Sequence, residues 1–397
     1  MTLRPQDLIR APYWNCPFCH AEAVFGVLSV GGHSYTRRCK NCWEICYFEL
    51  PPLQPRVLYL DQFFLSNVVK TLDPSTEPSR RQRTDPLGFY RNAFEKIHRL
   101  CNLQLLVCPY SPVHYHESIV SNDYFSKLKR LYEMLSHGAS FQAPTWIRDA
   151  QILSSAGKWA GVPSKNERII SRSHVIHGRI DEWQRLFQIT LNRRLSPSRK
   201  DQLRNSRARE YQGYLRVHER WRAEKHRNFA YWLREEQSAL SQDSNLERSL
   251  TREFREVPIG ESELREKTRE YLKSETLGDV PFVKISCHLF AALARRAPQR
   301  KSPPKGHPFN DVDMLSAYLP YCDAMFIDRE MHGLLDEKPL KSTLTYGARI
   351  FSLRSKQDFL DFLDQIESSA PAEHLAKVRE VYGDGWEKPY VEVFHEN

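Results

Sequence analysis

The feature that most constrains the fold of this chain is a pair of Cys-x-x-Cys motifs near its N-terminus. The first pair is Cys16 and Cys19, and the second is Cys39 and Cys42. A Cys-x-x-Cys turn directs two thiolates toward one point, and two such turns complete the tetrahedron that Zn²⁺ prefers. The motifs therefore predict a structural zinc site with these four ligands. Four protein ligands leave the metal no open position, so we do not expect this site to be catalytic.

The segment between the two motifs has the pattern of a small antiparallel sheet. Residues 24–30 are mostly apolar and strand-like, Gly31 and Gly32 form a turn signal, and residues 34–37 resume a strand pattern. Two strands flanked by metal-binding turns are typical of a zinc ribbon. We therefore predict a zinc ribbon over residues 1–50, a scaffold that most often contacts nucleic acid or protein.

Other cysteines and histidines near the motifs have alternative interpretations. His20 and His33 are spare candidate ligands, and strand alternation around Cys46 favours a packed side chain over a ligand. A redox role is the alternative for a single Cys-x-x-Cys motif, and the pairing of two motifs argues against it. The total of nine cysteines is odd, and no apolar signal region follows Met1. Both observations disfavour a disulfide framework, and the reducing cytoplasm is the expected location.

The charge balance favours a polyanionic partner. Lys and Arg together number 58 against 49 Asp and Glu, which gives a net charge of +9. Basic chains of this kind bind nucleic acid or anionic membrane surfaces, although many soluble proteins are mildly basic. No stretch approaches the roughly 18–20 consecutive apolar residues that span a bilayer. We therefore expect nucleic acid and no membrane as the partner.

Beyond a proline-rich linker at residues 51–55, apolar strand patterns alternate with helical patterns in two separate parts of the chain. The predicted strands are 56–61, 103–108, 323–328 and 349–353. Alternation of this kind predicts a parallel sheet covered by helices on both faces. We expect an α/β core in two parts, interrupted by a basic helical insertion and followed by a tail with one helical piece. The predicted boundaries are 56–140, 141–279, 280–368 and 369–397.

Some secondary-structure predictions are more detailed. The polar segment 71–84 is interpreted as a loop, residues 111–135 as one helix, and residues 301–308 as a proline-rich loop. A long helical pattern starts at Ser196 and continues until residues 258–260 interrupt it. Its aromatic residues fit a packed face, while its arginines fit either a solvated face or a surface for single-stranded nucleic acid.

Acidic residues fall at corresponding places in successive strand–helix units. Asp61 and Asp328 each end an apolar strand, and Asp311 and Asp313 open a helix. Glu117 lies early in the helix that follows strand 103–108. Ligand sites of parallel sheets lie beyond the carboxyl ends of the strands, so we expect these carboxylates to converge. Oxygen ligands suit Mg²⁺ or Mn²⁺, and such ions hydrolyse phosphodiesters. Helix capping is the alternative explanation for each acid taken alone.

Several polar residues beside these acids have plainer explanations. His114 and His116 are expected at the surface near a helix start, with phosphate contact or proton transfer as the functional alternative. Ser111 is interpreted as a helix cap rather than a nucleophile. Asp123 and Glu133 lie on the same predicted helix as Glu117 and are alternatives to it.

These short motifs give the chain a resemblance to PIN-like nuclease domains. The residues that carry it are Val-Leu-Tyr-Leu-Asp at 57–61, Glu117, Asp-Met-Leu-Ser-Ala at 313–317 and Met-Phe-Ile-Asp at 325–328. The resemblance implies a three-layer α/β/α sandwich with a parallel sheet and metal-dependent hydrolysis of RNA, less often of DNA. It implies that Asp61, Asp313 and Asp328 hold Mg²⁺ or Mn²⁺. Glu117 would complete the acidic site, and Asp311 is a possible helper or substitute for Asp313.

The function expected from the sequence is therefore a cytoplasmic endoribonuclease with an N-terminal zinc ribbon. The family also includes toxins and defence effectors, and such a role would fit. The separation between Glu117 and Asp313 is longer than in small members of the family. The intervening insertion is interpreted as a substrate clamp, a self-association surface or a partner-binding arm. The alternative is a non-catalytic adaptor that binds nucleic acid or protein through the ribbon and the basic helices.

Overall fold

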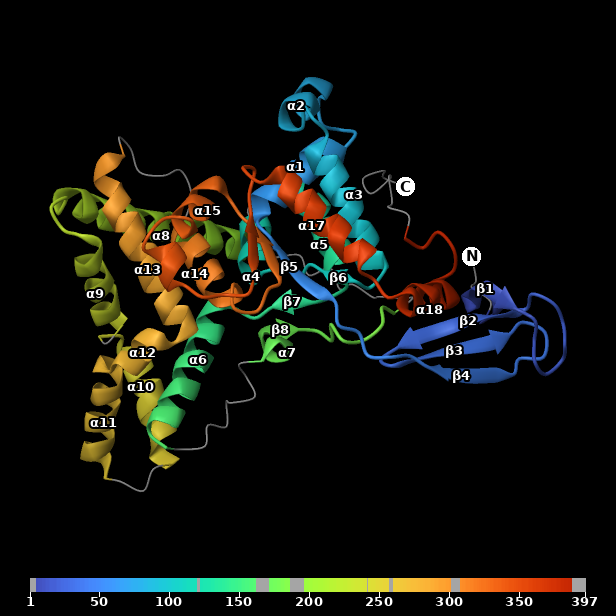
Figure 1. Cartoon of the computed structure of the whole chain (residues 1–397), viewed down its shortest axis with the longest axis horizontal. Coiled ribbons are helices and arrows are strands. Elements are labelled where there is room, and N and C mark those ends of the chain that lie inside the picture. Colours follow the sequence, from blue (N-terminus) through green and yellow to red (C-terminus); the bar gives the residue numbers. More distant parts are fainter. Residues whose placement is uncertain are drawn as a thin grey trace.

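The protein consists of an N-terminal antiparallel sheet, a central parallel sheet with helices on both sides, and a helical insertion (Figure 1). The computed structural model describes residues 5–119, 122–161, 171–185, 196–240, 242–256, 260–300 and 308–387. In the helices around residue 120, the description leaves out the side chains of 115–117, 119 and 122–124.

The central sheet has four parallel strands in the order β10-β9-β5-β6. They are β5 (Arg56–Leu60), β6 (Leu106–Val107), β9 (Ala324–Phe326) and β10 (Arg349–Phe351). Leu60 of β5 lies beside Phe326 of β9, although more than half of the chain separates them in sequence. The prediction of an α/β core with a parallel sheet is confirmed.

Side chains of β5 alternate between two apolar cores, because successive residues of a strand point to opposite faces. Leu58 and Leu60 belong to one core, while Val57 and Tyr59 belong to the other. The helices of the first core are α1 (Gln62–Leu72), α3 (Phe89–Asn102), α5 (Asn122–Ser136) and α17 (Lys356–Ser368). Those of the second include α6 (Pro144–Trp159), α13 (Pro281–Arg296) and α14 (Pro308–Tyr318).

The insertion is helical and packs against α13 and α14 rather than standing apart from them. Tyr214, Trp221 and Trp232 are buried in the same apolar core as these two helices, so the prediction of a packed aromatic face holds for these three. Besides α6, the insertion contains the helices α7 (Arg172–Val175), α8 (Pro197–Ala223), α9 (Phe229–Leu240), α10 (Ser244–Glu253), α11 (Glu261–Lys273) and α12 (Glu275–Asp279).

Several local predictions are wrong. The long helical pattern breaks after α8, and the Asn228 side chain accepts a hydrogen bond from the Tyr231 N–H (2.9 Å) where α9 begins. The second half of the predicted loop 71–84 is α2 (Pro78–Thr84), because proline suits the first turn of a helix. Two other predictions extend beyond the described residues. Of the predicted helix 111–135, the structure describes α4 (Pro112–Ile119) and α5, and residues 120–121 between them lie outside the described residues. Residues 301–307 of the predicted proline-rich loop lie outside the described residues. The insertion also contributes a two-stranded antiparallel sheet, β7 (Ser140–Phe141) and β8 (Ile176–His177).

The N-terminal sheet is antiparallel, and the C-terminal helix covers one of its faces (Figure 1). Its strands are β1 (Arg10–Trp14), β2 (Phe25–Gly31), β3 (Ser34–Cys39) and β4 (Ile45–Glu49), and the helix is α18 (Ala372–Tyr382). Val378 and Val381 of α18 pack with Val27 and Tyr35 of the sheet. The helical piece expected in the tail is therefore part of the ribbon's apolar core.

Arg37 links α18 to the N-terminal sheet, the predicted zinc ribbon, through hydrogen bonds. The residue is 0% exposed, and its guanidinium donates to the backbone carbonyls of Pro12 (2.8 Å), Phe25 (3.0 Å) and Glu380 (2.7 Å). The same group lies 3.3 Å from the centre of the Trp14 ring. A charged group can be buried only where hydrogen bonds to protein replace those to water. For Arg37 the three carbonyl oxygens accept these hydrogen bonds, and the Trp14 ring adds a cation–π contact.

Replacing Arg37 by methionine should lower the free energy of unfolding by about 3–5 kcal/mol, because three carbonyl oxygens lose their donor in a buried place. Urea denaturation measures the loss, and limited proteolysis should cut more readily around α18. The neighbouring Arg38→Met is the control, with an expected loss of about 1 kcal/mol or less, because Arg38 is only partly buried. Equal stability of the Arg37 variant and wild type would contradict this role.

Two buried histidines should make the stability of the central core depend on pH. His98 of α3 and His114 of α4 are 2% and 1% exposed, and burial lowers the pKa of His98 to about 4 and that of His114 to about 3. Histidine in an unfolded chain titrates near pH 6.5, so below that pH the unfolded state binds protons that the folded state does not.

Above about pH 6.5, the two histidines should not reduce the free energy of unfolding, because they are mostly neutral in both the folded and the unfolded state. As the pH falls from there toward about 4, the free energy of unfolding should decrease. The expected slope is up to about 1.4 kcal/mol per pH unit for each histidine. Urea denaturation across this range measures it. His98→Phe keeps the ring packing against Phe94 (centroids 5.7 Å apart) and should flatten the slope. An unchanged slope in that variant would count against the explanation.

Candidate metal centres

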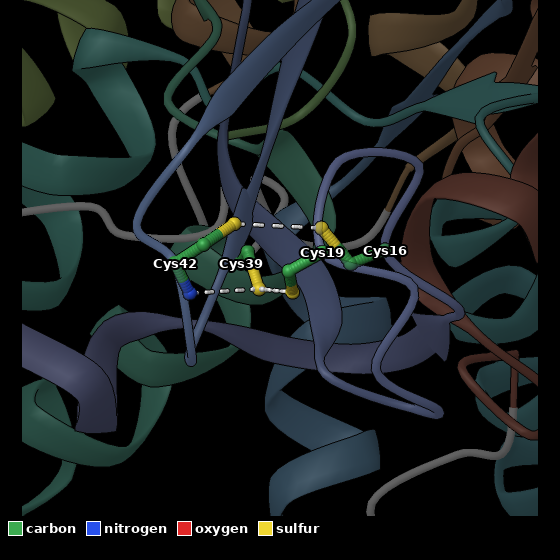
Figure 2. Close-up of side chains that lie close together, drawn as sticks. All are labelled: Cys16, Cys19, Cys39 and Cys42. Carbon is green, nitrogen blue, oxygen red and sulfur yellow. Dashed lines mark hydrogen bonds between the residues drawn. The ribbon is translucent and has the colours of Figure 1, made fainter.

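Four cysteines at one end of the ribbon bring their sulfur atoms together. The Sγ atoms of Cys16 and Cys42 are 3.6 Å apart, and those of Cys19 and Cys39 are 3.7 Å apart (Figure 2). All four sulfur atoms lie within 4.8 Å of one another. A tetrahedral zinc with Zn–S bonds of about 2.3 Å requires sulfur–sulfur distances of roughly 3.8 Å. The predicted ligand set is thus assembled, and its geometry is compatible with zinc.

Backbone N–H groups in the two turns point at the sulfur atoms. The Phe18 N–H donates to Cys16 Sγ (3.4 Å), and the N–H groups of Asn41 (3.2 Å) and Cys42 (3.3 Å) donate to Cys39 Sγ. The Ala21 N–H and the Asn41 side chain lower the pKa of Cys19 to about 6. Hydrogen bonds of this kind favour the thiolate, which is the form that binds metal.

The spare ligand candidates do not join this group. Within the described part of the chain, Cys16, Cys19, Cys39 and Cys42 are the only set of three or more potential ligands with such close donor atoms. Cys46 packs beside them as a partly buried residue of β4, as strand alternation predicts. His20 and His33 are exposed.

A second candidate centre lies at the carboxyl edge of the parallel sheet. Asp61 directly follows β5, and Asp328 follows the neighbouring strand β9 after one residue. The Asp61 N–H donates to the Phe326 carbonyl (3.0 Å), which fixes the register of the two strand ends. The predicted placement of these two acids at one edge of the sheet therefore holds.

Both acids cap helices. Asp61 Oδ1 accepts from the Phe63 N–H (3.4 Å) at the start of α1. Asp328 Oδ1 accepts from the N–H groups of Glu330 (2.6 Å) and Met331 (2.7 Å) at the start of α15 (Arg329–Leu335). Burial raises the pKa of Asp328, although the two N–H donors oppose this shift. Capping thus accounts for part of the hydrogen bonding of each carboxylate.

Asp311 lies in the first turn of α14, as predicted, but Asp313 lies in the middle of the helix, because α14 begins at Pro308, three residues earlier than predicted. Burial raises the pKa of Asp313 to about 6, and the charge of Arg148 on α6 partly opposes this. Within the described residues, the Asp313 carboxylate takes part in no hydrogen bond or ion pair. A partly desolvated carboxylate of this kind is typical of positions that interact with a cation or a proton during function.

Glu117 lies on α4, and its side chain is outside the described residues. The backbone around it is held close to the sheet edge. Gln62, the residue after Asp61, donates to the Ser118 hydroxyl (3.2 Å), and this hydroxyl donates to the His114 carbonyl (2.7 Å). The alternative acid Glu133 is paired with Lys129 (3.2 Å).

A buried polar network under this edge was not predicted. The Tyr59 hydroxyl and His114 Nε2 share a hydrogen bond (2.9 Å), and the Ser111 and Tyr318 hydroxyls share another (3.1 Å). The expectation that His114 lies at the surface is wrong, because the residue is buried and its ring packs against the rings of Tyr59 and Tyr132. Ser111 is a cap, as expected, since it accepts from the Val113 N–H (3.1 Å).

The predicted acids are not gathered into one tight cluster. Among the described residues, Asp61, Asp311, Asp313 and Asp328 do not include three whose oxygens lie within 4.8 Å of one another. Arg300 pairs with Glu330 beside Asp328, so a positive charge borders the edge. The arrangement thus provides two acids at one strand edge with further acids on α14, rather than a finished ligand cage.

Comparisons with known proteins do not assign the chain to a family. The chain matches no family model, no curated protein and no solved structure. In the part of the chain that the structure describes, no helix has both the length and the apolar character needed to cross a membrane.

Proposed function

We propose that the protein is a metal-dependent endoribonuclease with a PIN-like α/β/α core and a structural zinc ribbon. The observation that carries the proposal is the placement of Asp61 and Asp328 at the ends of adjacent parallel strands, joined there by the hydrogen bond from Asp61 N to Phe326 O (3.0 Å). In parallel α/β sheets this edge is where ligands bind.

In this proposal Asp61, Asp313 and Asp328 hold Mg²⁺ or Mn²⁺, with Glu117 and Asp311 as further acids of the site. Carboxylate oxygens are the ligands that these cations prefer, and carboxylates that repel one another are drawn together by a divalent charge. The cation supplies Lewis-acid activation of water and of a phosphodiester. The caps at α1 and α15 hold the two strand-end carboxylates at the edge, and burial around Asp313 strengthens its interaction with any positive charge.

The insertion offers a basic surface for the RNA backbone. The first half of α8 carries exposed or partly exposed residues throughout, and its cations are Arg199, Lys200, Arg204, Arg207 and Arg209. Farther along the same helix, Tyr214 packs edge-on against Phe309 at the start of α14 (5.2 Å between ring centroids). The second half of α8 thus contacts the start of α14, the helix that bears Asp311 and Asp313, and the basic first half would neutralise phosphates.

The four-cysteine site is proposed to hold zinc with a structural role. Its sulfur-only donor set and its 3.6–3.7 Å spacings support zinc rather than a hard cation. Because the two sites differ in ligand chemistry, we assign catalysis to the acidic edge and a structural role to the cysteine site.

The test is incubation of zinc-loaded protein with labelled RNA and with labelled DNA, in Mn²⁺, in Mg²⁺ and without a divalent cation. Cleavage of RNA only with added cation supports the proposal, and faster cleavage of DNA would make the protein a DNA nuclease. Binding of RNA with no cleavage under any condition would favour the adaptor, for which the specific support is the basic half of α8.

A further inference from the structure

In the described part of the chain, α18 covers one face of the ribbon sheet, and the other face, which carries the exposed Tyr47, is the open face. Tyr35 of β3 and Phe48 of β4 stack at 4.9 Å on the face beneath α18. Their neighbours in sequence point the other way, because side chains alternate along a strand. Thr36 and Tyr47 are paired across β3 and β4, and Ser29 pairs with Thr36 from β2. These residues therefore lie on the face opposite α18.

The open face carries two exposed tyrosines. Tyr47 is 76% exposed, and Tyr13 of β1 is 37% exposed. The Tyr13 ring packs against Gly26, where a Cβ atom would be only 2.5 Å from the nearest ring atom. Gly26 pairs with Arg38 of β3, which alternates with the buried Arg37 and so belongs to the open face. The glycine thus makes room for an aromatic ring on this face.

Cations accompany the aromatic rings. Lys40 Nζ lies 4.0 Å from the centre of the Tyr13 ring and donates to its hydroxyl (2.5 Å). The Arg38 guanidinium lies 4.6 Å from the centre of the Trp43 ring and donates to the Trp43 carbonyl (3.1 Å). Between the tyrosines the face presents the hydroxyl groups of Ser29 and Thr36, which bond to each other (2.5 Å).

We propose that this open face binds single-stranded nucleic acid, with bases stacked on Tyr13 and Tyr47 and phosphates near Arg38 and Lys40. Exposed aromatic rings on a sheet, flanked by cations, are the usual platform for unpaired bases, because every base has a face that can stack. The cations beside these rings favour a polyanion as the partner, because each can neutralise a phosphate. The chain's net charge of +9 agrees with a polyanion.

This surface is distinct from the acidic edge and does not depend on catalysis. The experiment measures fluorescence anisotropy of a labelled oligouridine of about 12 nucleotides, a length that suits a small binding fold, with the full-length zinc-loaded chain and no Mg²⁺ or Mn²⁺. Tyr47→Ala should weaken binding by about 5- to 100-fold, because one stacked base is lost. Tyr47→Phe keeps the ring and should bind like wild type. Lys40→Gln should reduce the salt dependence by about one phosphate contact.

The matched control is Leu87→Ala, since Leu87 is 87% exposed and lies outside the ribbon. Unchanged binding in this variant, with a loss in Tyr47→Ala, supports the proposal. No binding by wild type, equal binding by Tyr47→Ala, or equal losses in the Ala and Phe variants would overturn it. The assay contains no divalent cation and requires no cleavage, so a failure of the nuclease proposal leaves this result unaffected.

Discussion

Replacing Asp328 by asparagine should reduce metal-dependent RNA cleavage by about 10²-fold or more while the fold stays intact. The substitution removes a negative charge that would otherwise attract the cation. Asparagine is also a good N-cap residue, so its side-chain oxygen can still accept from the N–H groups of Glu330 and Met331 at the start of α15. Cleavage rates with Mn²⁺, together with denaturation curves, separate the loss of charge from a loss of stability.

Asp61→Asn should behave in the same way, because it keeps the cap on α1 and removes the partner charge on the adjacent strand. Asp323→Asn is the matched control. Asp323 precedes β9 at the opposite end of the strand, where it accepts from the Val57 N–H (2.7 Å) and pairs with Arg56 (3.2 Å). Activity retained in both Asp61→Asn and Asp328→Asn would rule out the acidic edge as the catalytic site. Equal loss in the control would show a general charge effect.

The elements that the sequence predicted well have strong local signals. The strands predicted at residues 56–61 and 323–328 contain β5 and β9, because each is a short run of apolar residues. The errors lie where the local signal is weak or misleading. The helix α2 has no buried residue, so no apolar period marks it. The strands β7 and β8 are two residues each, too short for a recognisable alternation.

The two candidate centres differ in how far sequence alone could define them. The cysteine ligands lie on two local turns, so their spacing in the sequence is enough to predict that the four sulfur atoms meet at one point. The acidic edge depends on β5 pairing with β9, a contact between Leu60 and Phe326 that no local pattern specifies. The bond between Gln62 and Ser118 and the burial of His114 likewise arise from packing between distant segments. Only their residue types, and not their contacts, were visible in the sequence.

Replacing Cys39 by serine should release the zinc and unfold the metal end of the ribbon. Cys39 is 0% exposed, and its sulfur lies 3.7 Å from that of Cys19. The buried apolar cluster at this end contains only Phe25 besides two of the cysteines, so little packing would replace the metal. Structural zinc sites contribute on the order of 10 kcal/mol to folding. We therefore expect about one zinc per wild-type chain, and a large loss of zinc in Cys39→Ser and in Cys16→Ser.

Cys46→Ser is the matched control, because Cys46 is partly buried beside the site and is not one of its four ligands. This variant should keep its zinc and its stability. Metal analysis of purified protein measures the zinc, and proteolysis reports the ribbon, where α18 should become accessible only in the ligand variants, since Val378 and Val381 pack on the sheet. If Cys16→Ser or Cys39→Ser retained a full complement of zinc, that cysteine would not be a ligand. If the zinc were lost while α18 stayed protected, the metal would not be what holds the sheet together.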